Sequence, residues 1–161
     1  MKGLLDILIF GRFFKSAKKS LLVALLDEII DYEVVNLAVA IAKNNKLGIV
    51  LVHTMEISRD YPIDADLPNE RKNGWKYIRY FEALFKSNRC KVEYSGLIMA
   101  RDAGVAVTKE ALVRDVEIIM VGLPYKHRQG TYALGTTVSS ILKNAYCEVL
   151  VVRQSSPNKI S

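Results

Sequence analysis

Short apolar runs alternate with longer stretches of helical periodicity along this chain from Ser20 onward. Continuous apolar runs are typical of strands that are buried on both faces of a parallel sheet. Parallel neighbours need long crossover connections, and the helical stretches supply them. The pattern therefore predicts an α/β fold, a doubly wound, mostly parallel five-stranded sheet with helices on both faces. The expected strands are Leu21–Leu26, Leu47–Thr54, Lys91–Met99, Val116–Val121 and Glu148–Val152, and the expected helices are Tyr32–Lys46, Asn69–Ser87, Gly104–Asp115 and Thr136–Ala145.

The chain length of 161 residues predicts one main domain with a core of its own. Its net charge of +6 is uneven: residues 1–20 hold five lysines and arginines against one aspartate, a net +4, which leaves +2 for the rest. A nucleic-acid-binding surface needs a basic stripe on the fold itself, so nucleic acid is not an expected partner. We expect residues 1–19 to form a basic and apolar extension, residues 20–153 the main domain, and residues 154–161 a flexible tail.

The segment 3–14 is apolar almost all round and is followed by the lysine-rich stretch KSAKKS. It is either an amphipathic anchor on an anionic membrane surface or a segment that packs on its own sheet or across a dimer interface. No apolar run approaches the roughly 18 residues of a transmembrane helix, and Asp6 interrupts what would be a signal peptide. Cys90 and Cys147 share no metal-ligand spacing, which indicates small core or boundary thiols in a reducing cytoplasm.

A glycine, a basic loop and a helix start follow one another after the fourth expected strand. Gly122 ends that strand, and Gly135–Thr136 opens the last helix. A helix start presents unpaired N–H groups and a partial positive charge, and glycine lets a phosphate approach the backbone. The basic run Lys126–Arg128 in the loop either clamps phosphates or is a solvated surface. The segment is therefore a candidate phosphate site.

Ligands of doubly wound sheets bind beyond the carboxyl ends of the strands, where the winding direction reverses. Asp27, Thr54 and Gly122 each end an expected strand. Asp27 is either a ligand for a base or ribose, or a carboxylate that favours the start of the following helix. His53 ends a buried strand and is expected to be structural. His127 has no nucleophile or metal partner identifiable in the sequence, and no catalytic motif is present, so no committed enzyme is predicted.

The spacing from Gly122 to Thr136 carries a more specific signal. Gly122 is followed by two residues, Tyr125, nine residues and then Gly135–Thr136. This register resembles the nucleotide signature of the universal stress protein family, which is Gly, two residues, Gly, nine residues, Gly, then Ser or Thr. The resemblance covers roughly residues 20–153 and implies a Rossmann-like nucleotide-binding domain. The stretches SSILKNAYCEVLVVR, LLVALLDE and IVLVHT resemble the last helix with the final strand, the first strand and the end of the second strand.

The resemblance implies ATP, alone or with Mg²⁺, as the ligand, held in the crevice between the first and fourth strands. Two positions depart from the family pattern. Tyr125 carries a Cβ where the family has a glycine, so a positive φ becomes costly there. Val138 offers no hydroxyl. The implied nucleoside contacts are Asp27 and Thr54, the implied ribose and phosphate contacts are Gly122, Tyr125, Gly135, Thr136, Thr137 and Val138, and Lys126 and Arg128 are the candidate phosphate clamps.

The predicted function is that of a cytoplasmic nucleotide-binding signalling or stress-response module. With no catalytic constellation in the sequence, slow ATP hydrolysis is the most that a bound nucleotide would allow. The alternatives are a dimeric scaffold without nucleotide binding and a peripheral membrane protein that uses its basic N-terminal segment. The last strand, Glu148–Arg153, is apolar, and family members commonly pair through it, so a homodimer is expected.

Overall fold

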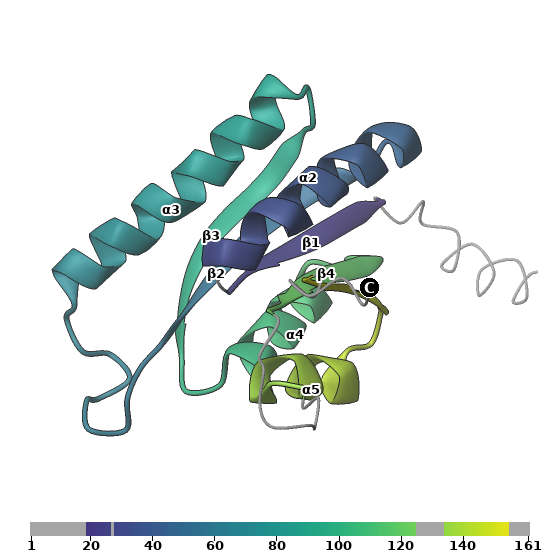
Figure 1. Cartoon of the computed structure of the whole chain (residues 1–161). Helices are drawn as coiled ribbons and strands as arrows, with labels where there is room; N and C mark the ends of the chain where they lie inside the picture. The colour runs from purple at the N-terminus through teal and green to yellow at the C-terminus, as the bar shows by residue number, and fades with distance from the viewer. Residues whose placement is uncertain (1–18, 27, 125–133, 155–161) are drawn as a thin grey trace, which may run out of the picture.

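The computed structural model describes residues 19–26, 28–124 and 134–154, and within these ranges strands and helices alternate (Figure 1). The strands are β1 (Ser20–Leu25), β2 (Gly48–Glu56), β3 (Val92–Ala100), β4 (Ile118–Leu123) and β5 (Glu148–Arg153). The helices are α2 (Glu28–Asn45), α3 (Pro68–Ser87), α4 (Ala103–Val113) and α5 (Thr136–Asn144). The strands form one parallel sheet in the order β3-β2-β1-β4-β5. The predicted α/β fold is confirmed.

The winding direction of the sheet reverses between β1 and β4. The chain moves outward from β1 through β2 to β3, and β4 then returns to pair with the other side of β1. Helices α2 and α3 cover one face, and α4 and α5 cover the other (Figure 1). The carboxyl ends of β1 and β4 therefore flank the place where ligands of such sheets bind.

Alternate residues of each strand enter two separate hydrophobic cores. In β1, Leu21, Val23 and Leu25 pack with α2 and α3, whereas Leu22 and Ala24 pack with α4 and α5. Every side chain of β1 is buried, because helices cover both faces of this central strand. This double burial explains why the sequence shows continuous apolar runs rather than an alternation of apolar and polar residues.

The fourth strand lies further along the chain than its apolar run predicts. The sequence predicts a strand over Val116–Val121, but β4 spans Ile118–Leu123. Its pairing with β5 continues through Gly122, opposite Val152, and Leu123, opposite Arg153. The ladder of backbone hydrogen bonds thus extends the strand past its most apolar residues. As a correction to the prediction, Gly122 lies inside the strand rather than at its end, because Leu123 follows it in β4.

Helix α2 begins at Glu28, before the predicted start at Tyr32. The additional residues bury Ile30 completely, in the same core as Val34 of the next turn. Burial of an isoleucine side chain contributes about 1.5–3 kcal/mol, which is enough to extend a helix by one turn.

Most of the two predicted terminal segments falls outside the described residues. Of the extension 1–19 only Lys19 is described, and of the tail 154–161 only Gln154. Among the described residues, no helix combines the length and the apolar character that a bilayer crossing requires.

Candidate functional site

The candidate site lies at the carboxyl-end edge of the sheet, where the winding reverses. The register pairs Leu25 of β1 with His53 of β2, and Ala24 of β1 with Val121 of β4. Thr54 is the next residue of β2 and is therefore level with the end of β1. Among the predicted site residues, the structure describes Thr54, Gly122, Gly135, Thr136, Thr137 and Val138, whereas Asp27, Tyr125, Lys126 and Arg128, together with His127, lie outside the described residues.

The hydroxyl of Thr54 is buried without a hydrogen-bond partner among the described residues. The residue is 7% exposed. It lies on the face covered by α4 and α5, because Val50 and Val52 of the same strand belong to that core and Thr54 continues their alternation. A buried hydroxyl left unpaired costs about 1–3 kcal/mol, so such groups call for an explanation. A ligand that supplies a hydrogen bond at this edge would provide one.

The start of helix α5 is the second part of the site. Gly135 is its N-cap, in extended conformation with φ −61° and ψ 158°, and no side chain caps the helix. A Cβ built on Gly135 would meet nothing within 4 Å, so the space beside this backbone is open. Thr136 is exposed and Thr137 is half-buried. A helix start of this kind offers backbone N–H donors and a partial positive charge to an anion.

Val138 has a structural role in addition to its predicted place in the site. Its side chain is 3% exposed and packs in the core between α5 and the sheet, together with Val121 and Leu123. Only its backbone N–H can therefore face a ligand. The departure from Ser or Thr at this position exchanges a hydroxyl for apolar contact with the core.

Gly122 also has a structural role that the signature does not reveal. A Cβ at this position would lie 2.6 Å from Cγ2 of Ile30 and 3.1 Å from Cγ2 of Val34, both on α2. The first distance is well below van der Waals contact. Glycine at this position thus lets α2 pack closely on β4, whether or not a ligand is bound.

A polar cluster next to this edge was not predicted from the sequence. His53 Nδ1 lies 2.9 Å from the carbonyl oxygen of Leu25, and the His53 ring contacts that of Tyr77 with centroids 5.1 Å apart. The Tyr77 hydroxyl donates a hydrogen bond of 2.9 Å to Asp31 Oδ2 on α2. His53 is therefore structural, as predicted. Asp31 is completely buried. It lies four residues before Val35 on the apolar stripe of α2, and this position in the sequence could have indicated that its side chain is buried.

The same cluster borders a cavity of about 300 Å³ between the ends of β1 and β2 and helix α3. Leu26, Met55 and Asn73 contribute to its wall beside His53 and Tyr77. In the part of the chain that the structure describes, no group of three or more His, Cys, Asp or Glu side chains is arranged to hold a metal ion.

Comparisons with known proteins agree with this architecture. The family model of the universal stress protein family matches residues 18–153. A universal stress protein from Archaeoglobus fulgidus has a similar structure, with a TM-score of 0.67, 13% sequence identity, and 90% of this chain and 98% of that chain covered. The universal stress protein from the same organism in complex with dAMP gives a TM-score of 0.63, 13% identity and coverage of 84% and 98%.

A third similar structure comes from a plant. A universal stress protein family protein from Arabidopsis thaliana with AMP bound gives a TM-score of 0.59 at 16% identity, and 86% of this chain and 93% of that chain are covered. No curated protein sequence matches this chain significantly. At such identities the solved structures establish the fold, and the family model, which spans most of the chain, establishes the family. This chain belongs to the universal stress protein family.

Proposed function

We propose that this protein binds an adenine nucleotide, ATP alone or with Mg²⁺, at the carboxyl-end edge between β1 and β4. The observation that carries the proposal is the buried hydroxyl of Thr54 near the end of β2, which has no hydrogen-bond partner among the described residues. The adenine base and the ribose carry donors and acceptors that could satisfy it. The uncapped start of α5 on the same side of the sheet offers backbone donors to the phosphates.

The residues divide between the two parts of the nucleotide. Asp27 and Thr54 would contact the nucleoside. The backbone of the helix start, from Gly135 to Val138, would hold phosphates, since Gly135 leaves open space beside it. Asp27, Tyr125, Lys126 and Arg128 enter this proposal through the family signature alone, because they lie outside the described residues. The contribution of Gly122 would be through its backbone.

The known structures support an adenine nucleotide as the ligand class. The Archaeoglobus fulgidus protein is in complex with dAMP, and the Arabidopsis thaliana protein has AMP bound. We infer that nucleotide occupancy changes the surface at this edge of the sheet and that a partner protein recognises the change. In this role the protein is a nucleotide-responsive signalling or stress module that needs no rapid hydrolysis.

Calorimetric titration of the full chain with Mg·ATP, AMP and dAMP tests the proposal. We expect saturable binding in the micromolar to sub-millimolar range. Gly135→Val should abolish it, because the branched side chain fills the space that a phosphate would approach. Thr54→Val should weaken the binding, and Ser95→Ala is its matched control, which should leave the binding unchanged. The Ser95 hydroxyl is also buried without a partner among the described residues, but it lies in the middle of β3, paired with Leu51, away from the edge.

A melting experiment gives an independent measurement. A ligand present at 100 times its Kd adds about 2.7 kcal/mol to the free energy of unfolding, which raises the melting temperature clearly. If Mg·ATP, AMP and dAMP at millimolar concentration all leave the melting temperature of the wild type unchanged, the proposal fails, and the dimeric scaffold becomes the favoured function. One observation favours that second function: β5 is an edge strand, and its Leu150 is 40% exposed.

A further inference from the structure

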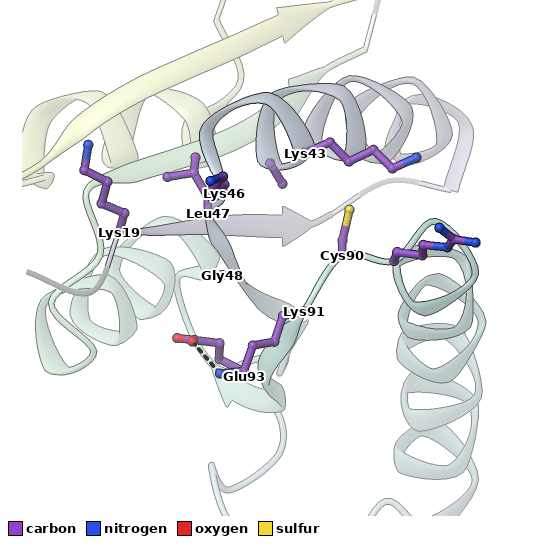
Figure 2. A pocket seen from close by; sticks show the side chains of 10 residues that line it. Lys19, Lys43, Lys46, Leu47, Gly48, Cys90, Lys91 and Glu93 are labelled. Atoms are coloured by element: carbon purple, nitrogen blue, oxygen red, sulfur yellow. Dashed lines mark ion pairs between the residues drawn. The ribbon is translucent and has the colours of Figure 1, made fainter.

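A strongly basic cavity lies at the opposite, amino-end edge of the sheet (Figure 2). Its volume is about 480 Å³, and it opens where β1, β2 and β3 begin and where α2 and α3 end. The proposed nucleotide site does not use this edge. Five cationic side chains line the cavity: Lys19, Lys43, Lys46, Arg89 and Lys91.

The main chain fixes the positions of these cations. The Gly48 N–H donates to the carbonyl oxygen of Lys19 over 2.9 Å, and the Ile49 N–H donates to that of Lys91 over 2.8 Å. These two bonds join the starts of three neighbouring strands. The main chain therefore holds Lys19 at the start of β1 and Lys91 at the start of β3, on either side of β2.

The cavity carries a net charge of +4, from five cations and the single carboxylate of Glu93. Glu93 pairs with Lys91 at 3.4 Å, drawn as a dashed line in Figure 2. Within the described residues, Lys19, Lys43, Lys46 and Arg89 take part in no ion pair. Cations that line one cavity with a single carboxylate among them make its electrostatic potential positive, which favours the binding of an anion there.

Helix ends account for part of this charge. Lys46 and Arg89 follow α2 and α3 in left-handed conformation, with φ of 55° and 60°, where glycine is the commonest residue. Cations near helix carboxyl ends are favoured by the helix dipole, by typically 0.3–1 kcal/mol each. The dipole does not account for Lys19 and Lys91, which precede strands. The convergence of two helix ends and two strand starts on one cavity is the feature that needs an explanation.

The remaining ionisable group of the cavity adds no negative charge. Burial raises the pKa of the Cys90 thiol above its ordinary value, although the nearby charge of Lys43 opposes the rise. The thiol therefore stays protonated at neutral pH. Glu93 remains as the internal counter-charge, and it reaches over the start of β2 because Gly48 has no side chain: a Cβ at Gly48 would lie 2.5 Å from Glu93 Cδ.

We propose that this cavity binds a compact anion that carries several phosphate groups, and that Glu93 weakens this binding by neutralising part of the positive charge. Phosphate oxygens accept hydrogen bonds from lysine and arginine together, and Arg89 adds a planar guanidinium that can bind two oxygens at once. The same chemistry fits a free polyphosphate compound and the phosphorylated headgroup of a lipid. This site and the proposed nucleotide site lie at opposite edges of the sheet, so an experiment can reject either proposal without affecting the other.

Calorimetric titration of the full chain with inorganic tripolyphosphate at low ionic strength tests the site. We expect Lys19→Gln/Lys46→Gln to weaken binding by about tenfold or more, since two charges leave the cavity. The control, Lys72→Gln/Lys109→Gln, removes the same charge from exposed positions on α3 and α4 and should change the affinity less than twofold. Equal weakening by both double variants would overturn the proposal, because it would indicate general charge attraction.

Two further variants make the test sharper. Glu93→Gln should tighten tripolyphosphate binding several-fold, because it removes the negative charge of the cavity. A partly unfolded variant would bind more weakly, so tighter binding cannot be due to unfolding. Unchanged or weaker binding would contradict the role of Glu93. Gly135→Val removes any tripolyphosphate binding at the nucleotide edge and should leave intact the binding that Lys19→Gln/Lys46→Gln weakens. Loss of binding in Gly135→Val, with binding retained in Lys19→Gln/Lys46→Gln, would place the anion at the nucleotide edge and overturn the proposal.

Vesicle co-sedimentation distinguishes the two sources of phosphate. Vesicles of phosphatidylcholine that contain phosphatidylinositol bisphosphate, whose headgroup carries several phosphates, are compared with phosphatidylcholine alone, for the wild type and for both double variants. Binding to the anionic vesicles that is lost only in Lys19→Gln/Lys46→Gln supports the site with a lipid headgroup as its ligand. Tripolyphosphate binding with no vesicle binding supports it with a free anion. No binding of either probe overturns it.

Discussion

Ile30 of α2 lies so close to Gly122 of β4 that a Cβ added to the glycine would be 2.6 Å from its Cγ2. This contact joins α2 to β4 beside the winding reversal. The first glycine of the nucleotide signature is thus also a packing residue. Its presence in a sequence cannot by itself establish nucleotide binding, because the fold needs it as well.

Gly122→Ala should destabilise the protein by about 1–3 kcal/mol, the usual range for overpacking a core. The new methyl group must displace Ile30 and with it the start of α2. Gly135→Ala is the matched control: the space at Gly135 is open and its φ of −61° suits any residue, so a few tenths of a kcal/mol are expected from the weaker cap. Urea denaturation measures both. Equal losses for the two variants would contradict the packing role of Gly122.

Tyr77→Phe should destabilise the protein by about 1–3 kcal/mol, because it removes a hydrogen bond to the completely buried carboxylate of Asp31. Tyr80→Phe controls for the loss of a phenolic hydroxyl. Tyr80 is 53% exposed and contacts Tyr32 and Phe81 through its ring, so its substitution should be nearly neutral. Thermal melting of both variants decides the matter: a neutral Tyr77→Phe would show that Asp31 does not depend on this donor.

The fold could be predicted from the sequence because both faces of the sheet are covered. Runs such as Leu21–Leu26 then become continuously apolar, and the helical segments between them fix parallel pairing. The ends of elements were less predictable. The last residues of β4 are held by backbone pairing with β5, which does not depend on the side chains, and so the apolar run did not show that the strand continues past Gly122 to Leu123.

The candidate site could be predicted only in part. Thr54 and Gly135 follow from the strand end and the helix start, which are local features. The position of Asp31 on the apolar stripe of α2 is a local signal of its burial, but its bond with Tyr77 depends on the packing of α2 against α3, and residues so far apart in sequence give no local signal of such a contact. The basic cavity was missed for the same reason: Lys19, Lys46 and Lys91 lie far apart along the chain, and only the parallel sheet brings their strand starts together.

Thr54→Val should raise the stability of the nucleotide-free protein and lower its affinity for ATP. Valine has nearly the same shape and removes a buried hydroxyl that has no partner among the described residues, so a gain of about 1 kcal/mol is expected. In a domain of this size that gain raises Tm by about 2–4 °C. Loss of one hydrogen bond to the ligand should weaken ATP binding by about tenfold. If stability rises while affinity for ATP is unchanged, the hydroxyl is a structural defect and no part of the site.

The exposed edge of β5 should mediate a homodimer. The other edge of this strand pairs with β4, where the Glu148 N–H donates to the carbonyl oxygen of Glu117 and the Gln154 N–H donates to that of Leu123. In a parallel ladder successive N–H groups alternate in direction, so the N–H of Val151 points away from β4. Among the described residues no strand lies on this side of β5, and an apolar edge strand of this kind is a template for pairing with a second copy.

Val151→Pro should therefore give a folded monomer, since proline removes an outward N–H and is tolerated on an edge strand. Val151→Ala is the control for the lost side chain and should remain a dimer. Light scattering across a micromolar dilution series measures the mass against 18.1 kDa for one chain, and circular dichroism checks that the proline variant keeps its fold. A wild-type mass of one chain at every concentration would rule the dimer out. A dimer that persists in Val151→Pro would place the interface on another surface.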